Sequence, residues 1–148
     1  MRPFSQGQHL LNDVASYYRN NPGYWAKGTW GFFPDGEAVD GPRPYGVVLA
    51  RIKKCCPDIA ISKFGPDHGG SKAEAEARAL LCQQIARSND RLNIWHWNDA
   101  KHRTVEQVID TLQKASGMNV VVQESLAELF DVIPIQPVMS IDEQQIAA

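Results

Sequence analysis

The chain has 148 residues, of which 43% are hydrophobic and 22% are charged, and its formal net charge is −2 at pH 7. These values are typical of one folded domain, and they exclude a disordered chain, a fibrous repeat and an overall attraction to polyanions. The longest apolar run, residues 45–50, is far shorter than the roughly 20 residues that span a bilayer. Three cysteines and an N-terminus unlike a secretory leader predict a cytoplasmic protein that inserts in no membrane.

Apolar residues at helical spacing predict a first helix over about residues 6–20 and a second from residue 45 up to Pro57. Ser5 precedes the first helix, and Gln8 comes three residues after Ser5, which is the pattern of a capping box. Pro57 is expected to end the second helix, because proline cannot continue the hydrogen-bond ladder. The linker that follows finishes in a glycine-rich loop without the Gly-Lys-Ser/Thr ending of a phosphate-binding loop.

Two further helices are predicted in the second half of the chain. The third covers about residues 71–88 and opens with Ser71 and Glu74, a second capping box. Its apolar stripe is predicted to consist of Ala75, Ala79, Cys82 and Ile85, with Leu81 beside it. The fourth helix follows Thr104, which begins a third capping box, and Gly117 is placed to end it.

The remaining segments complete the predicted fold. Between the first two helices, aromatic residues precede the turn signal Pro34-Asp35-Gly36, and residues 37–39 are expected to return as the second strand of a small hairpin. Residues 119–148 hold five acids and no Lys or Arg, yet they are too apolar for a typical disordered segment. We therefore predict a helix-dominated α+β fold with about four main helices, a small β-hairpin and a partly extended C-terminal tail.

This division predicts a helical domain over residues 1–118 and an acidic apolar tail over 119–148. The tail is expected to dock on its own domain, on a protein partner or on another copy of the chain in a homo-oligomer.

The stretch from Trp95 to Thr104 is dense in aromatic and ionisable side chains. His96, Asp99 and His102 are of the types that move protons or bind metals. On a helix their directions would spread over about 120°, and on a strand Asp99 would face away from both histidines. We therefore expect no metal and no cofactor. The favoured role of this stretch is structural: a tryptophan anchors it in the core, and Asn98 or Asp99 bonds to the backbone of the turn.

Two classes of function stay open. The first is a non-enzymatic binding or protein-interaction domain, because tryptophan and arginine supply much of the energy at binding surfaces. Its candidate residues are Trp25, Trp30, Trp95, Trp97 and Arg103. The alternative is a small hydrolase or transferase that uses His96 or His102 with Asp99 as an acid–base pair. The chain has no nucleophile motif such as Gly-x-Ser-x-Gly, so binding is favoured.

Nucleic-acid binding is a third class. It would use Arg51, Lys53, Lys54 and the basic run 101–103. No known DNA-reading motif accompanies these charges, and the net charge is negative. We therefore interpret them as solvated faces and expect no nucleic-acid partner.

Two blocks of sequence carry a resemblance to a known family. They are Trp97-Asn98-Asp99 with Arg103-Thr104 and the apolar positions 108, 112 and 115, and Trp25-Ala26-Lys27-Gly28 with Asp35-Gly36. The chain resembles, over about residues 8–116, a bacterial and phage family known only as a domain of unknown function. The resemblance implies a shared fold and an accessory or mobile-element role, without an established activity. Family members carry a Cys and a Gly-Ala pair where this chain has residues 44–47, Pro-Tyr-Gly-Val, so no role of that thiol is transferred.

Overall fold

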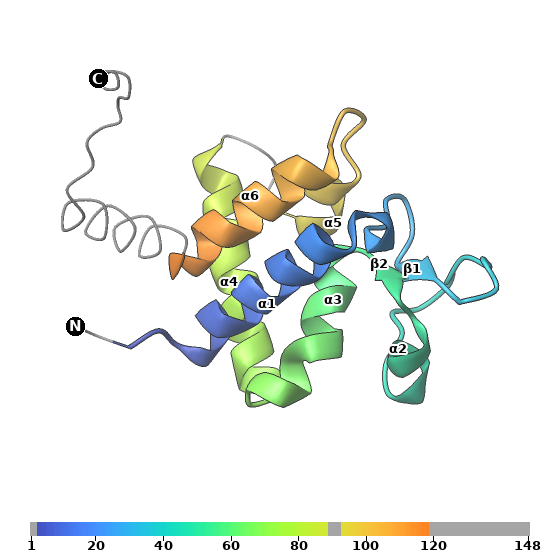
Figure 1. Cartoon of the computed structure of the whole chain (residues 1–148), viewed down its shortest axis with the longest axis horizontal. Coiled ribbons are helices and arrows are strands. Elements are labelled where there is room, and N and C mark those ends of the chain that lie inside the picture. Colours follow the sequence, from blue (N-terminus) through green and yellow to red (C-terminus); the bar gives the residue numbers. More distant parts are fainter. Residues whose placement is uncertain (1–2, 89–92, 119–148) are drawn as a thin grey trace, which may run out of the picture. The chain divides into compact units, whose positions relative to one another are not determined.

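The computed structural model describes residues 3–88 and 93–118 (Figure 1). Within this part of the chain, four longer helices are accompanied by short helices and two short strands, which confirms the helix-dominated α+β fold class. The longer helices are α1 (Gln6–Asn20), α3 (Pro57–Phe64), α4 (Ser71–Arg87) and α6 (Val105–Ser116). The shorter elements are the helices α2 (Val47–Arg51) and α5 (Ile94–Asn98), the 3-10 turns η1 (Pro22–Tyr24) and η2 (Gly65–His68), and the strands β1 (Gly31–Phe32) and β2 (Lys54–Cys55).

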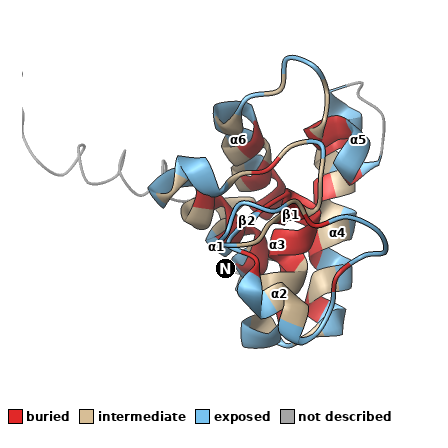
Figure 2. Cartoon of the chain, turned by 90° about the vertical axis from the view of Figure 1, so that its right-hand side faces the viewer, coloured by how far each residue is buried: buried red, intermediate tan, exposed pale blue. Residues whose placement is uncertain are grey.

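The core lies where α1 packs against α3, α4 and α6. Figure 2 shows buried residues on the sides of these helices that face one another. Leu10, Leu11 and Tyr18 of α1 are fully buried, and burial of each such side chain stabilises the fold by about 1.5–3 kcal/mol. The Tyr18 hydroxyl donates a hydrogen bond of 2.7 Å to the carbonyl of Cys55, which ties α1 to β2. The core therefore also fixes the position of the small sheet.

The first and last described helices begin and end as predicted. Ser5 caps α1 and Thr104 caps α6, and both capping boxes form with the glutamine three residues on. Gly117 ends α6 with a φ of 73°, a left-handed conformation that glycine adopts without strain.

The second predicted helix is wrong in extent. Only Val47–Arg51 is helical, the backbone turns extended at Ile52, and Pro57 begins α3 instead of ending a helix. The segment predicted as a linker therefore contains the helix α3. The physical reason is that proline at the first helical position lacks a donor that would be unpaired there anyway, so it starts a helix as readily as it ends one.

The third predicted helix is confirmed as α4, but its start and its buried stripe differ. Gly70 is the N-cap and its end has no side-chain cap, so Ser71 does not form the expected capping box. Ala75 and Ala79 are exposed. The buried positions are Ala73, Ala77, Leu81 and Ile85. Alanines occur on several faces of this helix, and packing of Leu81 against the core decides which alanines are covered.

The strands β1 and β2 pair antiparallel, with Gly31 opposite Cys55 and Phe32 opposite Lys54. The turn at residues 34–36 forms, and the chain returns to Phe32 through a single antiparallel bridge to Ala38. The two-residue ladder of β1 is thus made with β2 rather than with residues 37–39. Gly31 permits this close approach, because a Cβ there would lie 2.4 Å from the carbonyl oxygen of Lys54.

The predicted tail, residues 119–148, lies outside the described residues. The expectations about its docking therefore stay predictions. Among the helices that the structure describes, none is long and apolar enough to cross a membrane.

Candidate ligand-binding site

Two segments about seventy residues apart are joined by hydrogen bonds next to β1. The Trp25 Nε1–H donates to Asn98 Oδ1 over 2.6 Å, and Asn98 Nδ2 donates to the carbonyl of Ala26 over 2.9 Å. The Gly28 backbone N–H donates to Asp99 Oδ1 over 2.8 Å. We call these five residues the clamp. Asn98 is fully buried, and its side chain supplies hydrogen-bond partners to the Trp25 indole N–H and to the Ala26 carbonyl. The clamp therefore fixes the loop before β1 against the end of α5.

The short helix α5 is held at both ends. Asn93 caps it, because its side-chain oxygen accepts hydrogen bonds from the backbone N–H groups of Trp95 and His96. The indole of Trp97 is 3% exposed and anchors α5 in the core. Arg103 covers this ring at 4.9 Å and its Nε–H donates to the Trp97 carbonyl over 2.8 Å. Trp95 is left on the outer side of α5, with 44% of its surface exposed.

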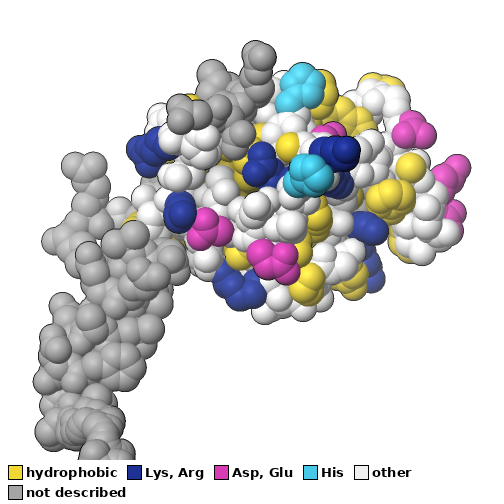
Figure 3. All heavy atoms as spheres, turned by 90° about the horizontal axis from the view of Figure 1, so that it is seen from above, with side chains coloured by type: hydrophobic (Ala, Val, Ile, Leu, Met, Phe, Trp, Pro, Cys, Tyr) yellow, Lys and Arg dark blue, Asp and Glu magenta, His cyan; other side chains and the backbone are white. Residues whose placement is uncertain are grey.

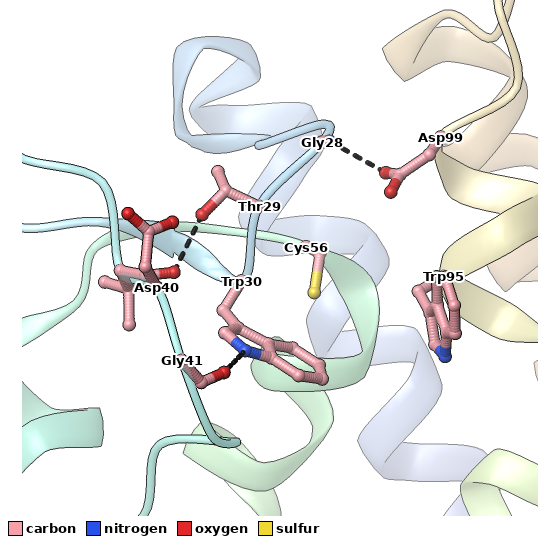
Figure 4. Close-up of a pocket in the computed structure, with 9 residues that line it drawn as sticks. Gly28, Thr29, Trp30, Asp40, Gly41, Cys56, Trp95 and Asp99 are labelled. Carbon is pink, nitrogen blue, oxygen red and sulfur yellow. Dashed lines mark hydrogen bonds between the residues drawn. The ribbon is translucent and has the colours of Figure 1, made fainter.

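A cavity of about 360 Å³ lies between the segment that contains β1 and the helix α5 (Figure 4). Its lining residues are Gly28, Thr29, Trp30, Val39, Asp40, Gly41, Cys56, Trp95 and Asp99. Figure 4 shows the indole rings of Trp30 and Trp95 on two sides, with the sulfur of Cys56 above the Trp30 ring and the carboxylate of Asp99 above Trp95. The volume falls in the range of about 300–1,000 Å³ that is usual for small-ligand sites.

The Trp30 wall is fixed by a hydrogen bond and by an ion-pair network beside it. The Trp30 Nε1–H donates to the carbonyl of Gly41 over 3.1 Å, and the Arg43 guanidinium lies 5.5 Å from the ring centroid. Arg43 in turn donates to Asp58, whose carboxylate is 8% exposed and also accepts from Arg78 Nε over 2.7 Å. This arrangement connects the loop that follows β1 to the start of α3 and the middle of α4.

The Thr29 hydroxyl of the cavity is already used as a donor, whereas Asp99 keeps an open acceptor. The Thr29 hydroxyl donates to the carbonyl of Val39 over 2.9 Å. Asp99 Oδ1 accepts from Gly28 and from Asn98, whereas Oδ2 accepts no hydrogen bond from any residue that the structure describes. Burial raises the pKa of the Cys56 thiol to about 11, to which the negative charges of Asp58 and Asp99 contribute. Cys56 is therefore a neutral thiol at physiological pH.

The chain was compared with known protein families, curated proteins and solved structures. A model described as a family of unknown function, DUF6197, matches residues 8–117. The chain belongs to this family. No curated protein matches the chain, and no solved structure does. The predicted resemblance to a family of unknown function over about residues 8–116 is thereby confirmed, and the DUF6197 match contains the clamp and every lining residue of the cavity.

The tryptophans singled out from the sequence separate into two groups in this DUF6197 member. Trp30 and Trp95 line the cavity, whereas Trp97 is in the core and Trp25 donates to Asn98. Arg103 covers Trp97 rather than the cavity.

The predicted acid–base residues are not joined to one another by hydrogen bonds in the described structure. The His96 ring lies against Trp95 with centroids 3.9 Å apart and ring planes tilted by 49°. His102 is exposed, and the Asp99 carboxylate accepts from Gly28 and Asn98. No group of three His, Cys, Asp or Glu side chains among the described residues is placed to hold a metal ion.

The basic residues considered for nucleic acid lie over aromatic rings or on exposed surface. Arg51 lies 5.1 Å from the ring centroid of Phe33, and Lys54 lies 4.9 Å from that of Phe32. On the face shown in Figure 3, Lys and Arg side chains lie among Asp and Glu. This mixture forms no continuous basic stripe on that face, and the expectation about nucleic acid stays a prediction.

Several lining residues were not among the sequence candidates. Thr29, Asp40, Gly41 and Cys56 come from three separate segments, and no local pattern marks them. One signal was available for Thr29: it is adjacent to both Gly28 of the family block and Trp30.

The buried thiols predict an alkaline loss of stability. Burial raises the pKa of Cys55 to about 12 and that of Cys56 to about 11, against an ordinary value of 9.0. Above about pH 9 the unfolded chain loses thiol protons that the folded chain keeps, so the free energy of unfolding is unaffected below that pH and falls above it. We expect a loss on the order of 2 kcal/mol per thiol at about pH 10.5. Urea unfolding at about pH 8 and pH 10.5 measures it. A Cys56→Ala variant should lose less, and a stability equal at both pH values would contradict the account.

Proposed function

We propose that this protein is a small, non-enzymatic ligand-binding domain whose site is the cavity between Trp30 and Trp95. The observation that carries the proposal is the pair of indole rings facing one cavity, one of them with 44% of its surface exposed. A tryptophan left open to water in this way costs hydrophobic free energy that a bound ligand recovers.

The rigidity of the walls supports binding. The clamp fixes the Asp99 side of the cavity, and the ion pairs of Asp58 fix the Trp30 side through Arg43. A site that is formed before its ligand arrives loses less conformational entropy when the ligand binds. The two walls are therefore suited to hold a small molecule or a side chain of a protein partner.

Binding rather than catalysis is favoured by the state of the cavity's reactive groups. Cys56 is protonated at neutral pH, and the Thr29 hydroxyl donates to a backbone carbonyl. Neither is paired with a base among the described residues, so neither is an activated nucleophile. The alternative, a small hydrolase or transferase using His96 or His102 with Asp99, stays a prediction from the sequence.

The biological setting is proposed on the sequence alone. We expect a bacterial or phage protein that acts in the cytoplasm, as the family resemblance and the cysteine usage predicted. We also expect residues 119–148 to contact a protein partner or a second copy of the chain.

The test uses three probes with one six-carbon body, n-hexylammonium, n-hexanol and n-hexanoate, titrated into the full chain and followed by the NMR shifts of the backbone amides. We expect at least one probe to bind, and Trp95→Ala to weaken it by about 3- to 10-fold because one aromatic wall is lost. Tyr45→Ala is the matched control, since Tyr45 is 82% exposed and lies outside the cavity. Absence of binding by all three probes, or equal binding to Trp95→Ala, would overturn the proposal.

A further inference from the structure

We propose that the cavity recognises a primary ammonium group on an alkyl chain, with Asp99 Oδ2 as its acceptor and the rings of Trp30 and Trp95 against the chain. This inference rests on the proposed function and names the chemical class of its ligand. A free alkylamine and a lysine side chain share this chemistry.

The free hydrogen-bonding capacity of the cavity favours a ligand that donates hydrogen bonds. The N–H of Trp30 donates to Gly41, and the Thr29 hydroxyl donates to Val39. The indole nitrogen of Trp95 lies at the end of its ring that is remote from Asp99 (Figure 4). A group that reaches Asp99 Oδ2 therefore finds an acceptor and no competing donor from these side chains, which selects a ligand that donates hydrogen bonds.

The charge of the cavity lining favours a cation. The lining includes the carboxylates of Asp40 and Asp99 and no lysine or arginine. The basic network beside Trp30 balances its own charge. It pairs Arg43 and Arg78 with Asp58, and Arg78 also with Glu74. Tryptophan is the aromatic side chain that attracts cations most strongly. The Trp30 ring already has Arg43 over it, so the exposed ring of Trp95 is the wall that adds to the attraction of the carboxylates.

The single open oxygen of Asp99 favours an ammonium group over a guanidinium group. A guanidinium binds a carboxylate best through two parallel hydrogen bonds, one to each oxygen. Asp99 Oδ1 already accepts from the Gly28 N–H and from Asn98 Nδ2, so Oδ2 alone is open among the described contacts. A single acceptor suits the compact ammonium group, which needs no second oxygen in the same plane.

The experiment compares the same three head groups on one body. We expect n-hexylammonium to bind about tenfold more tightly than n-hexanol, because a hydrogen bond to a charged group is stronger than a neutral one, and n-hexanoate to bind most weakly. Nα-acetyl-lysine N-methylamide is the second arm. Tighter binding of this compound than of n-hexylammonium assigns the ammonium to a lysine side chain, and the reverse assigns it to a free amine.

Asp99→Asn is the decisive variant. Its amide oxygen can still accept from Gly28, while its NH₂ group replaces the open acceptor. We expect the preference for n-hexylammonium over n-hexanol to disappear while n-hexanol binds as before, which also shows that the variant is folded. Asp40→Asn removes an equal charge on the other side of Trp30 and should keep most of the preference (Figure 4).

The outcomes separate the two proposals. Equal affinity of n-hexanol and n-hexylammonium for the natural chain, lost in Trp95→Ala, would overturn the ammonium inference and leave the binding site in place. An equal loss of preference in Asp40→Asn and Asp99→Asn would overturn the assignment of the acceptor to Asp99. Binding that Trp95→Ala leaves unchanged would overturn the site itself.

Discussion

Replacement of Asn98 by alanine is expected to lower the free energy of unfolding by about 3 kcal/mol, because it strips partners from two groups in the interior. The Trp25 indole N–H and the carbonyl of Ala26 both bond to the Asn98 side chain, which is fully buried. Each group left without a partner costs about 1–3 kcal/mol. Chemical denaturation of the variant and the natural chain measures the difference.

Asn93→Ala is the matched control for this prediction. Asn93 lies at the other end of α5, is exposed, and accepts from the N–H groups of Trp95 and His96. Loss of an N-cap costs about 1 kcal/mol, so Asn98→Ala should be the more damaging change by a clear margin. If the two variants lose the same stability, the clamp is not the structural centre that its hydrogen bonds indicate.

Asp58→Ala is expected to lower the free energy of unfolding by about 2–3 kcal/mol. The carboxylate is 8% exposed and is the shared acceptor of Arg43 and Arg78. Removal of one partner from a buried ion pair costs about 3–5 kcal/mol. The two arginine side chains are 40% and 26% exposed, so water compensates part of that cost.

Asp110→Ala is the control for Asp58→Ala. Asp110 pairs with Lys114 over 2.9 Å on the surface of α6, and both side chains are more than half exposed. Such a pair contributes about 0.3–0.5 kcal/mol. Asp58→Ala should also weaken probe binding, because Arg43 then loses its anchor beside Trp30. An Asp58→Ala variant as stable as Asp110→Ala would show that the network contributes little.

Local signals explain which elements were predictable from the sequence. The helices α1 and α6 have a side-chain cap, an amphipathic face and, for α6, a terminal glycine, all within one continuous segment. In the segment from Val47 to Phe64, neither α2 nor α3 begins with a side-chain cap. The apolar residues of this segment have helical spacing, yet the backbone turns extended at Ile52, because Gly31 of another segment admits β2 beside it.

The candidate site was less accessible to sequence reasoning for a similar reason. The hydrogen bonds of the clamp join residues 71 to 73 positions apart, so no spacing rule within one segment reveals them. The aromatic residues were recognisable as a class, but the division of Trp30 and Trp95 from Trp25 and Trp97 depends on tertiary packing. Asn98 or Asp99 was expected to bond to the backbone of its own turn, and this was wrong, because their backbone partners, Ala26 and Gly28, lie in the distant segment.

The most direct test of the central claim is a titration of the full chain with n-hexylammonium, followed by the indole N–H resonances of its four tryptophans. We expect the signals of Trp30 and Trp95 to move with one common saturation curve. The signals of Trp25, bonded to Asn98, and of Trp97, in the core, should stay within a small fraction of those shifts. Shifts confined to Trp25 and Trp97, or no shift at Trp30 and Trp95 while the probe binds, would contradict the account.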